Sequence, residues 1–360
     1  MKILHVTTDF PYIKDGKIHN YGGLGLCVTQ LIEGLKGKGI EIDVLSRSES
    51  GIERELFEGV YRAPYIKLSN SRNWKLTHAL TLIPKLIRLI KDNKYDIIHV
   101  HNPPAGWGAI PVARFFKIKT VMTMHGPWSR VRERMSGFAT MIENDTLKVA
   151  DAVTFDSHSL LDMYPYKDKY FAIENAVDGN VFKPHDMKKA RETLMLDPKK
   201  RIFLYSGRNV YGKNIDTIRS IAGKFPKDIF LVTGWEGNAT DEEFSNLQYM
   251  GAVSNVDMPM LYSACNGLIL ASEMEGMSRA VLEAMACERA VILSNIPANR
   301  ETAGDYGLYF KDRTGLEDIL TIAKPIGLSR MGKLCRKRVL ENYGISNRIE
   351  KFIRLYNHIL

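Results

Sequence analysis

The chain has 360 residues, of which 45% are hydrophobic and 25% are charged, and its net charge is +9 at pH 7. This length is too great for one ordinary hydrophobic core and predicts two domains of roughly 150–200 residues each. No stretch approaches the run of about 18 apolar residues that a membrane-spanning helix needs. The start, MKILHVTTDF, leads straight into a strand-like pattern without a signal-peptide motif, so we expect a cytoplasmic location.

The cysteines and the net charge indicate which kinds of binding site the chain can form. The four cysteines are scattered and include no Cys-x-x-Cys pair, which predicts reduced thiols and neither a disulfide framework nor a zinc site. The positive charge favours an anionic partner such as phosphate, nucleic acid or an acidic membrane face, without distinguishing among them.

In the first half of the chain, short runs rich in β-branched residues alternate with amphipathic segments. The predicted strands are KILHVTT, EIDVLSR, DIIHVHN, TVMTMHG, AVTFDS and YFAIENA, and the predicted helices span about 24–38, 75–94, 105–117, 133–150 and 157–164. Strands that are apolar almost throughout are typical of a parallel sheet covered by helices on both faces. The alternation therefore predicts a doubly wound α/β domain.

After a polar join, NAVDGNVFKPHDMKK at 175–189, the alternation starts again. The second set of predicted strands is RIFLYSG, DIFLVTG, LQYMGA, GLILAS, AVILSN and GLYF, and the predicted helices span about 214–225, 256–264, 279–287 and 329–343. The final stretch, SNRIEKFIRLYNHIL, has apolar residues at helical spacing and predicts an amphipathic helix. Ligands of open α/β sheets bind at the carboxyl ends of the strands, so we expect a site in a cleft between the two domains.

The stretch YSGRNVYGKNID lies between a predicted strand and a predicted helix. Its core, Gly207-x4-Gly212-Lys213, matches a phosphate-binding P-loop except that Asn214 stands where Ser or Thr would bind Mg²⁺. Arg208 and Lys213 add two cations near a helix N-terminus, which is a suitable setting for an anion. A surface turn with solvated charges is the structural alternative.

A second stretch, EMEGMSRAVLEAMACERAVILSN, places two carboxylates eight residues apart. We expect Glu275 in a loop after a strand and Glu283 on the following helix, which Ser278 would cap. Two carboxylates can bind the hydroxyls of a sugar or ribose, and the N–H groups at 277–280 can bind a phosphate. Glu283 would otherwise be a solvated helix charge, but its neighbours are apolar and predict a buried carboxylate that needs a partner.

Two features of the first half also lie near predicted strand ends or helix starts. The pair Gly22-Gly23 opens a helix, where glycine allows the backbone to approach a ligand or simply makes a tight turn. His125 ends a predicted strand, as do His99 and His101. A His-x-His pair can bind a metal, but no carboxylate or cysteine accompanies this one in the sequence, and a structural role is the alternative for each histidine.

In this order, these motifs resemble those of the retaining glycosyltransferases of family 4, which have the GT-B fold. The resemblance covers nearly the whole chain and rests on the glycine pair, the His-Gly after a strand, ENAVDGNVFKP, GRNVYGKN and the E-x7-E element EGMSRAVLE. It implies two Rossmann-like domains facing across a cleft. These would be an acceptor domain at 1–180, a nucleotide-sugar domain at 181–342, and a helix at 343–360 that crosses back to the first domain.

The resemblance also implies roles for individual residues. Arg208 and Lys213 would neutralise the departing diphosphate, Glu283 would hold the ribose, and Glu275 would hold the donor sugar. His125 would contact that sugar near its anomeric carbon. The other implied donor contacts are Gly23, Gly276, Met277, Ser278 and Arg279.

We therefore expect a metal-independent transferase that moves a sugar from a UDP-, GDP- or ADP-sugar to an acceptor hydroxyl, with retention of anomeric configuration and no further cofactor. No two aspartates lie two residues apart, so the Asp-x-Asp metal motif of other transferases is missing. The acceptor could be a glycan, a small molecule or a lipid-linked sugar. A basic loop at Arg130, Arg132 and Arg134 suits an anionic acceptor or peripheral binding to the inner membrane face, and a solvated charged loop is the structural alternative. We expect no nucleic-acid partner.

The sequence leaves two alternatives to glycosyl transfer. A P-loop ATPase or kinase would use the motif from Gly207 to Lys213 with Mg²⁺. A non-catalytic binding protein, or a nucleotide-sugar epimerase that hydrolyses its substrate, would use the same fold without transferring the sugar.

Overall fold

A computed structural model describes residues 1–19, 22–66, 74–129, 137–165, 167–210, 212–234 and 243–360. The chain forms two compact units. Unit 1 comprises residues 1–174 together with 346–360, and unit 2 comprises residues 175–345. The change from the first unit to the second thus falls at the start of the polar join, and the C-terminal residues belong to unit 1.

Unit 1 is built on a parallel sheet that confirms the doubly wound prediction. Its strands are β1 (Lys2–Val6), β4 (Glu41–Arg47), β6 (Val60–Ala63), β7 (Ile97–Val100), β8 (Lys119–Met124), β9 (Ala152–Phe155) and β10 (Tyr170–Ala172). Their order across the sheet is β10-β9-β8-β7-β1-β4-β6. The order reverses between β1 and β7, and this reversal is where ligands of such sheets bind.

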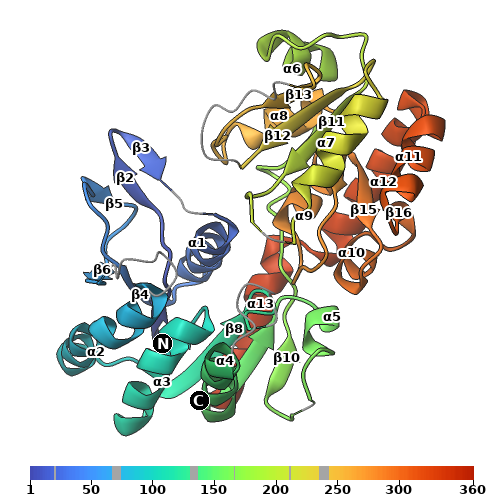
Figure 1. The fold of residues 1–360 in the computed structure, drawn as a ribbon. Helices are drawn as coiled ribbons and strands as arrows, with labels where there is room; N and C mark the ends of the chain where they lie inside the picture. Colours follow the sequence, from blue (N-terminus) through green and yellow to red (C-terminus); the bar gives the residue numbers. More distant parts are fainter. Residues whose placement is uncertain (20–21, 67–73, 130–136, 166, 211, 235–242) are drawn as a thin grey trace. The chain divides into compact units, whose positions relative to one another are not determined.

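Helices cover both faces of this sheet (Figure 1). They are α1 (Gly23–Lys36), α2 (Trp74–Asp92), α3 (Pro103–Phe115), α4 (Gly137–Val149), α5 (His158–Leu161) and α13 (Ile345–Ile359). Successive strand residues point to opposite faces. On one face Leu4, Ile98 and Met122 pack in a buried hydrophobic cluster with residues of α2, α3 and α4. The opposite face carries polar residues and contacts α13.

A small antiparallel sheet in unit 1 was not predicted. It consists of β2 (Tyr12–Lys14), β3 (Lys17–His19) and β5 (Arg54–Glu55) in the order β3-β2-β5. The turn between β2 and β3 is Asp15-Gly16, with φ of 51° and 67°. Positive φ at both central residues is characteristic of a two-residue hairpin turn, and Asp-Gly is a preferred sequence for it. The sequence therefore contained a usable indication of this hairpin.

Unit 2 has a second parallel sheet. Its strands are β11 (Ile202–Ser206), β12 (Ile229–Thr233), β13 (Leu247–Tyr249), β14 (Gly267–Leu270), β15 (Ala290–Ser294) and β16 (Leu308–Phe310). Their order is β13-β12-β11-β14-β15-β16, which is the Rossmann arrangement with its reversal between β11 and β14.

The helices of unit 2 include three that the sequence reading missed. The helices are α6 (Met187–Thr193), α7 (Ile215–Lys224), α8 (Met258–Ala264), α9 (Arg279–Ala286), α10 (Pro297–Ala303), a 3₁₀ turn η2 (Gly304–Tyr306), α11 (Arg313–Ile322) and α12 (Pro325–Asn342). The missed helices are α6, α10 and α11. The N-caps of α6 and α11 were readable, because Asp186 and Asp312 each accept a backbone N–H bond three residues later.

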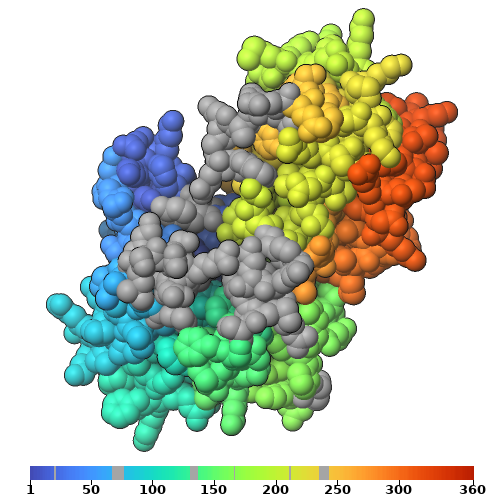
Figure 2. All heavy atoms as spheres, in the orientation of Figure 1, coloured from blue at the N-terminus to red at the C-terminus, as the bar shows by residue number. Residues whose placement is uncertain are grey.

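Helices α11 and α12 form an outer surface of unit 2, orange to red in Figure 2. None of the described helices combines the length and the apolar composition that crossing a membrane requires.

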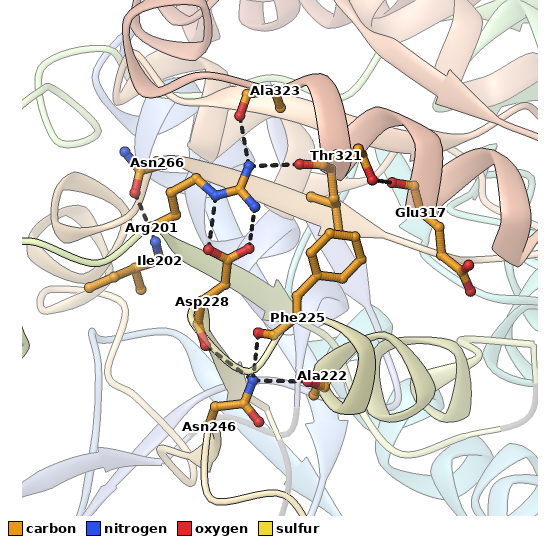
Figure 3. A network of polar contacts seen from close by, with 11 residues as sticks. Arg201, Ile202, Ala222, Phe225, Asp228, Asn246, Asn266, Glu317, Thr321 and Ala323 are labelled. Carbon is orange, nitrogen blue, oxygen red and sulfur yellow. Dashed lines mark hydrogen bonds and ion pairs between the residues drawn. The ribbon is translucent and has the colours of Figure 1, made fainter.

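A polar network holds the amino ends of β11 and β12 to the end of α11 (Figure 3). Arg201 binds both carboxylate oxygens of Asp228 and donates to the carbonyls of Leu320 and Ala323. The Asn246 amide donates to three carbonyls, including that of Asp228. These contacts fix the end of the unit 2 sheet that is opposite to the carboxyl ends of its strands.

Candidate functional site

The carboxyl ends of β11 and β14, on either side of the strand reversal in unit 2, carry the predicted phosphate and sugar residues. Arg208 follows β11 and is exposed, and no hydrogen bond or ion pair of its side chain is found with the described part of the chain. Lys213 forms an ion pair with Glu275, which lies in the loop after β14. Their side chains are 24% and 11% exposed, so both remain accessible to a ligand. The structure thus brings Lys213 and Glu275 together.

Asn214 shows why this stretch differs from a P-loop. It has left-handed backbone angles, with φ of 50° and ψ of 47°, and its side chain does not cap α7. Instead its amide donates to the Ala271 carbonyl at 3.1 Å. The Glu273 N–H donates to the Gly212 carbonyl at 2.8 Å. Asn214 therefore ties the loop after β11 to the loop after β14, whereas a β-branched Thr would be strained at this positive φ.

Glu283 is buried on α9, as its apolar neighbours predicted, and it has partners. It accepts hydrogen bonds from Arg279 at 2.9 Å and from the Tyr262 hydroxyl at 3.1 Å. Burial, together with the Glu283 carboxylate, raises the pKa of Tyr262 well above its usual value, so this phenol remains a donor. The sequence reading missed Tyr262, because it lies 21 residues from Glu283 on a separate helix.

The loop from Gly276 to Ser278 leads into α9. Ser278 occupies the N-cap position as predicted, but its side chain makes no capping hydrogen bond within the described residues. The first N–H groups of a helix have no partner inside the helix, so those at the start of α9 lie where an anion can bind. The Met277 carbonyl accepts a bond from Asn175 at 3.4 Å. The ENAVD motif thus contributes a side chain that holds this loop.

A cavity of about 360 Å³ lies at the carboxyl ends of β14, β15 and β16. Its lining includes Asn214, Ser272, Glu273, Ser294 and Lys311. It lies on the side of the unit 2 sheet where ligands of open α/β sheets bind.

In unit 1 the glycine pair begins α1 as predicted. Gly22 has φ of 131°, a backbone conformation that side-chain-bearing residues avoid, and Gly23 is the first residue of the helix. The glycine at position 22 is therefore required by the turn itself.

His125 directly follows β8 and lies beside Asp156, which directly follows β9. Its Nδ1 is 2.8 Å from the Asp156 carboxylate, and its Nε2 is 3.3 Å from Nδ1 of His101. The His125 side chain is 15% exposed, whereas that of Asp156 is 2% exposed. His125 is thus held from the core side and reaches the surface of unit 1.

His99 and His101 are buried with His5, a residue that the sequence reading did not single out. One nitrogen of each ring lies within 4.8 Å of the others, as a metal site would require. However, His5 Nδ1 is 2.8 Å from His101 Nε2, which is a hydrogen-bond distance, while two nitrogens on one tetrahedral zinc lie about 3.4 Å apart. His99 is hydrogen-bonded at both nitrogens, to Tyr356 and Thr123. The residues fit a hydrogen-bond network better than a metal centre.

The predicted basic loop cannot be placed in this site, because Arg130, Arg132 and Arg134 lie outside the described residues.

Two family models match this chain. The model for Glycosyltransferase Family 4 matches residues 21–179, and that for Glycosyl transferases group 1 matches residues 186–316. The first match covers the unit 1 sheet except β1, and the second covers the whole unit 2 sheet.

Curated proteins similar to the chain include enzymes that transfer sugars. It is 23% identical over 356 residues to the UDP-Gal:alpha-D-GlcNAc-diphosphoundecaprenol alpha-1,3-galactosyltransferase of Escherichia coli, with 91% of each chain covered. It is 22% identical over 404 residues to the alpha-maltose-1-phosphate synthase of Mycolicibacterium smegmatis, with both chains covered completely.

Solved structures share the fold at low sequence identity. Sucrose-phosphate synthase from Thermosynechococcus elongatus has a TM-score of 0.82 and 21% identity, covering 99% of this chain and 98% of that one. Anabaena HepE in complex with UDP and glucose has a TM-score of 0.77 and 15% identity, covering 99% of both. The chain therefore belongs to glycosyltransferase family 4, and its two Rossmann-like units have the GT-B fold.

Proposed function

We propose that this glycosyltransferase moves a hexose from a nucleoside diphosphate sugar to an acceptor hydroxyl, with retention of anomeric configuration and without a metal ion. The observation that carries the proposal is the contact between Lys213 and Glu275 at the strand reversal of unit 2. In a nucleotide sugar the β-phosphate is bonded directly to the anomeric carbon. A cation for that phosphate and a carboxylate for the sugar hydroxyls should therefore lie side by side, as these two residues do.

Departure of the nucleoside diphosphate builds negative charge on the leaving phosphate. Arg208, Lys213 and the N-terminus of α9 supply positive charge at the strand ends of unit 2. Fixed cations and N–H groups aimed at developing charge are among the largest contributors to catalysis. They would provide the stabilisation that Mg²⁺ gives in metal-dependent transferases.

The nucleotide ribose would bind to Glu283. Both oxygens of this carboxylate already accept hydrogen bonds, one from Arg279 and the other from Tyr262. An ionised carboxylate has about four lone-pair positions, so it can accept bonds from ribose hydroxyls as well. Arg279 and Tyr262 would then hold the carboxylate ready for the nucleotide.

For the chemical step we favour a same-face route without a covalent intermediate. Glu275 is paired with Lys213, which lowers its nucleophilicity and suits it for binding hydroxyls. His125 would contact the donor sugar near its anomeric carbon. Both nitrogens of its ring have partners within unit 1, which favours a positioned contact over proton abstraction.

We further propose an anionic acceptor, lipid-linked or glycan, at a cytoplasmic membrane face. Most of the net charge of +9 belongs to unit 1, the unit that the family uses for acceptors. The Escherichia coli relative is named for a diphosphoundecaprenol acceptor. A basic surface is attracted to such phosphates and to anionic lipids.

Thermal unfolding with UDP, GDP and ADP, each in EDTA, tests the donor site. We expect one of them to raise the midpoint in a concentration-dependent way, because a ligand that binds only the folded state stabilises it. A shift that appears only with a nucleoside triphosphate and Mg²⁺ would instead support an ATPase or kinase.

A further inference from the structure

One face of the unit 1 sheet carries a line of buried polar residues beneath α13. In the register of the strands, His5 of β1 lies opposite His99 of β7, and Thr123 of β8 lies opposite Thr154 of β9. Residues two positions further along a strand point to the same face. His101, His125 and Asp156 therefore extend this line toward the carboxyl ends of the strands.

Hydrogen bonds connect the line from one end to the other. Arg348 of α13 donates to one oxygen of Asp156 at 2.9 Å, and His125 Nδ1 lies 2.8 Å from the other oxygen. His125 Nε2 then faces His101 at 3.3 Å, and His101 Nε2 faces His5 at 2.8 Å. His5 Nε2 is buried and has no hydrogen-bond partner among the described residues.

These contacts favour one assignment of the N–H protons on the histidine rings. Asp156 faces the Arg348 cation and accepts bonds as a carboxylate, so His125 carries its proton on Nδ1. In the pattern that continues this direction, His125 accepts at Nε2 from His101, which in turn accepts from His5. The pattern leaves a lone pair on His5 Nε2. A buried acceptor without a partner is less unfavourable than a buried N–H without one, so the unpartnered atom agrees with this direction.

Polar and charged side chains here occupy a buried sheet face that apolar residues usually fill. Burying polar and charged groups has a free-energy cost even when they are paired, and apolar residues of similar volume often stabilise a protein as well or better. Stability alone therefore does not account for an Arg–Asp pair in which each side chain is 2% exposed. The feature that sets the line apart is His125, its one partly exposed member, whose side chain is 15% exposed.

We propose that Asp156 and Arg348 are positioning residues for the glycosyl transfer, since Arg348 fixes the Asp156 carboxylate and Asp156 fixes the tautomer and orientation of His125. This inference rests on the proposed contact of His125 with the donor sugar. It gives the C-terminal helix a role in the reaction, because α13 supplies the cation although it contributes no residue to the donor site proposed above.

The kinetic test compares two substitutions on α13. Arg348→Met removes the cation that holds Asp156. Lys351→Met, the matched control, removes an ion pair of the same helix with Glu174. Glu174 also pairs with His158, and neither of these partners belongs to the histidine line. We expect Arg348→Met to lower kcat by about tenfold or more with the donor KM within about twofold, because a small misplacement of a reacting group affects mainly the chemical step. Lys351→Met should leave both constants unchanged, and Arg348→Lys should recover part of the loss.

The spectroscopic test reads the tautomer directly. In protein labelled with ¹⁵N-histidine, the His125 signals, assigned from a His125→Gln variant, should show a proton on Nδ1. Asp156→Asn, which keeps the shape of the side chain, and Arg348→Met should both change this tautomer population. Thermal unfolding checks that each variant is folded. If Arg348→Met does not fold, the tautomer population in Asp156→Asn still tests the proposal.

Equal kinetic effects of Arg348→Met and Lys351→Met would overturn the proposal, as would an unchanged His125 tautomer in both network variants. A His125→Gln variant with normal turnover would refute the role of His125 in the reaction, while the tautomer measurement would still decide whether Asp156 and Arg348 set the state of the ring. The two failures are thus distinguishable.

Discussion

Arg348 and Asp156 form a buried ion pair across 192 positions of sequence, with Nη2 and Oδ1 2.9 Å apart. The pair links the start of the C-terminal helix to the end of β9. It neutralises a carboxylate that would otherwise be unfavourable in the interior, and it does so beside the rings of three buried histidines, His5, His99 and His101. The electrostatics of this sheet face therefore depend on the last fifteen residues of the chain.

The same histidines predict acid sensitivity. Burial lowers the pKa of His5 from 6.5 to about 3, and burial likewise lowers those of His99 and His101. Between pH 6.5 and about 3 the unfolded chain binds more protons than the folded chain, so the free energy of unfolding falls as the pH falls. Each histidine contributes up to about 1.4 kcal/mol per pH unit.

Urea unfolding at pH 7 and pH 5, followed by tryptophan fluorescence, measures this effect. Three of the four tryptophans belong to unit 1, so the signal reports mainly that unit. We expect a clear loss of stability at pH 5 and a smaller loss in His5→Phe. Equal stability at the two pH values would show that these histidines are not buried in the neutral form.

Lys213→Ala tests the leaving-group cation. We expect turnover to fall on the order of 10²-fold or more, because the variant loses charge that stabilises the transition state. Its stability should change by less than about 1 kcal/mol, as for other partly exposed ion pairs. Lys224→Ala, which removes an exposed ion pair with Glu317 at the other end of α7, is the control and should retain activity. Near-normal turnover in Lys213→Ala would refute the assigned role.

Glu283→Gln tests the ribose contact. The wild-type chain should bind its preferred nucleoside diphosphate about tenfold or more tightly than the 2′,3′-dideoxy form, because hydrogen bonds to a charged group contribute about 1.5–3 kcal/mol. In Glu283→Gln this preference should largely disappear. Calorimetric titration of both nucleotides into both proteins gives the comparison, and an undiminished preference in the variant would place the ribose elsewhere.

Asn214 allows a direct test of the P-loop alternative. Asn214→Thr completes the P-loop sequence but places a β-branched residue at φ of 50°. It should therefore be less stable than Asn214→Gly by roughly 1–2 kcal/mol, the usual cost of left-handed backbone. Both variants lose the bond to Ala271, so the difference isolates the backbone strain. Neither variant should hydrolyse ATP with Mg²⁺, and hydrolysis by Asn214→Thr would revive the alternative.

The alternation of strands and helices was predictable because residues close together in the sequence determine each element. The strand IFLYS, the cap position Ser278 and the helix start after Asn214 are each encoded within a few neighbouring residues. The hairpin at Asp15-Gly16 and the N-cap Asp312 were encoded in the same way and were overlooked. The two-domain GT-B fold was predicted through the order of the motifs, and the comparisons confirm it.

The partners of the site residues were not predictable from local patterns. His5 meets His101 across 96 positions, and Tyr262 meets Glu283 from another helix. Such contacts depend on which strands become neighbours and in which register, and a single sequence does not state this. The apolar neighbours of Glu283 indicated that it needed a partner, but they could not identify Tyr262 or exclude others.

The central claim is metal-independent transfer with retention, and proton NMR of donor turnover in EDTA tests it most directly. The preferred nucleoside diphosphate sugar, with its α-linkage, is incubated with the protein, and the first sugar transferred or released to water is recorded before its anomers equilibrate. We predict that the α-anomer of the unchanged sugar appears first, at a rate that EDTA does not alter. Initial release of the β-anomer, formation of an epimerised sugar, or loss of turnover in EDTA would contradict the account.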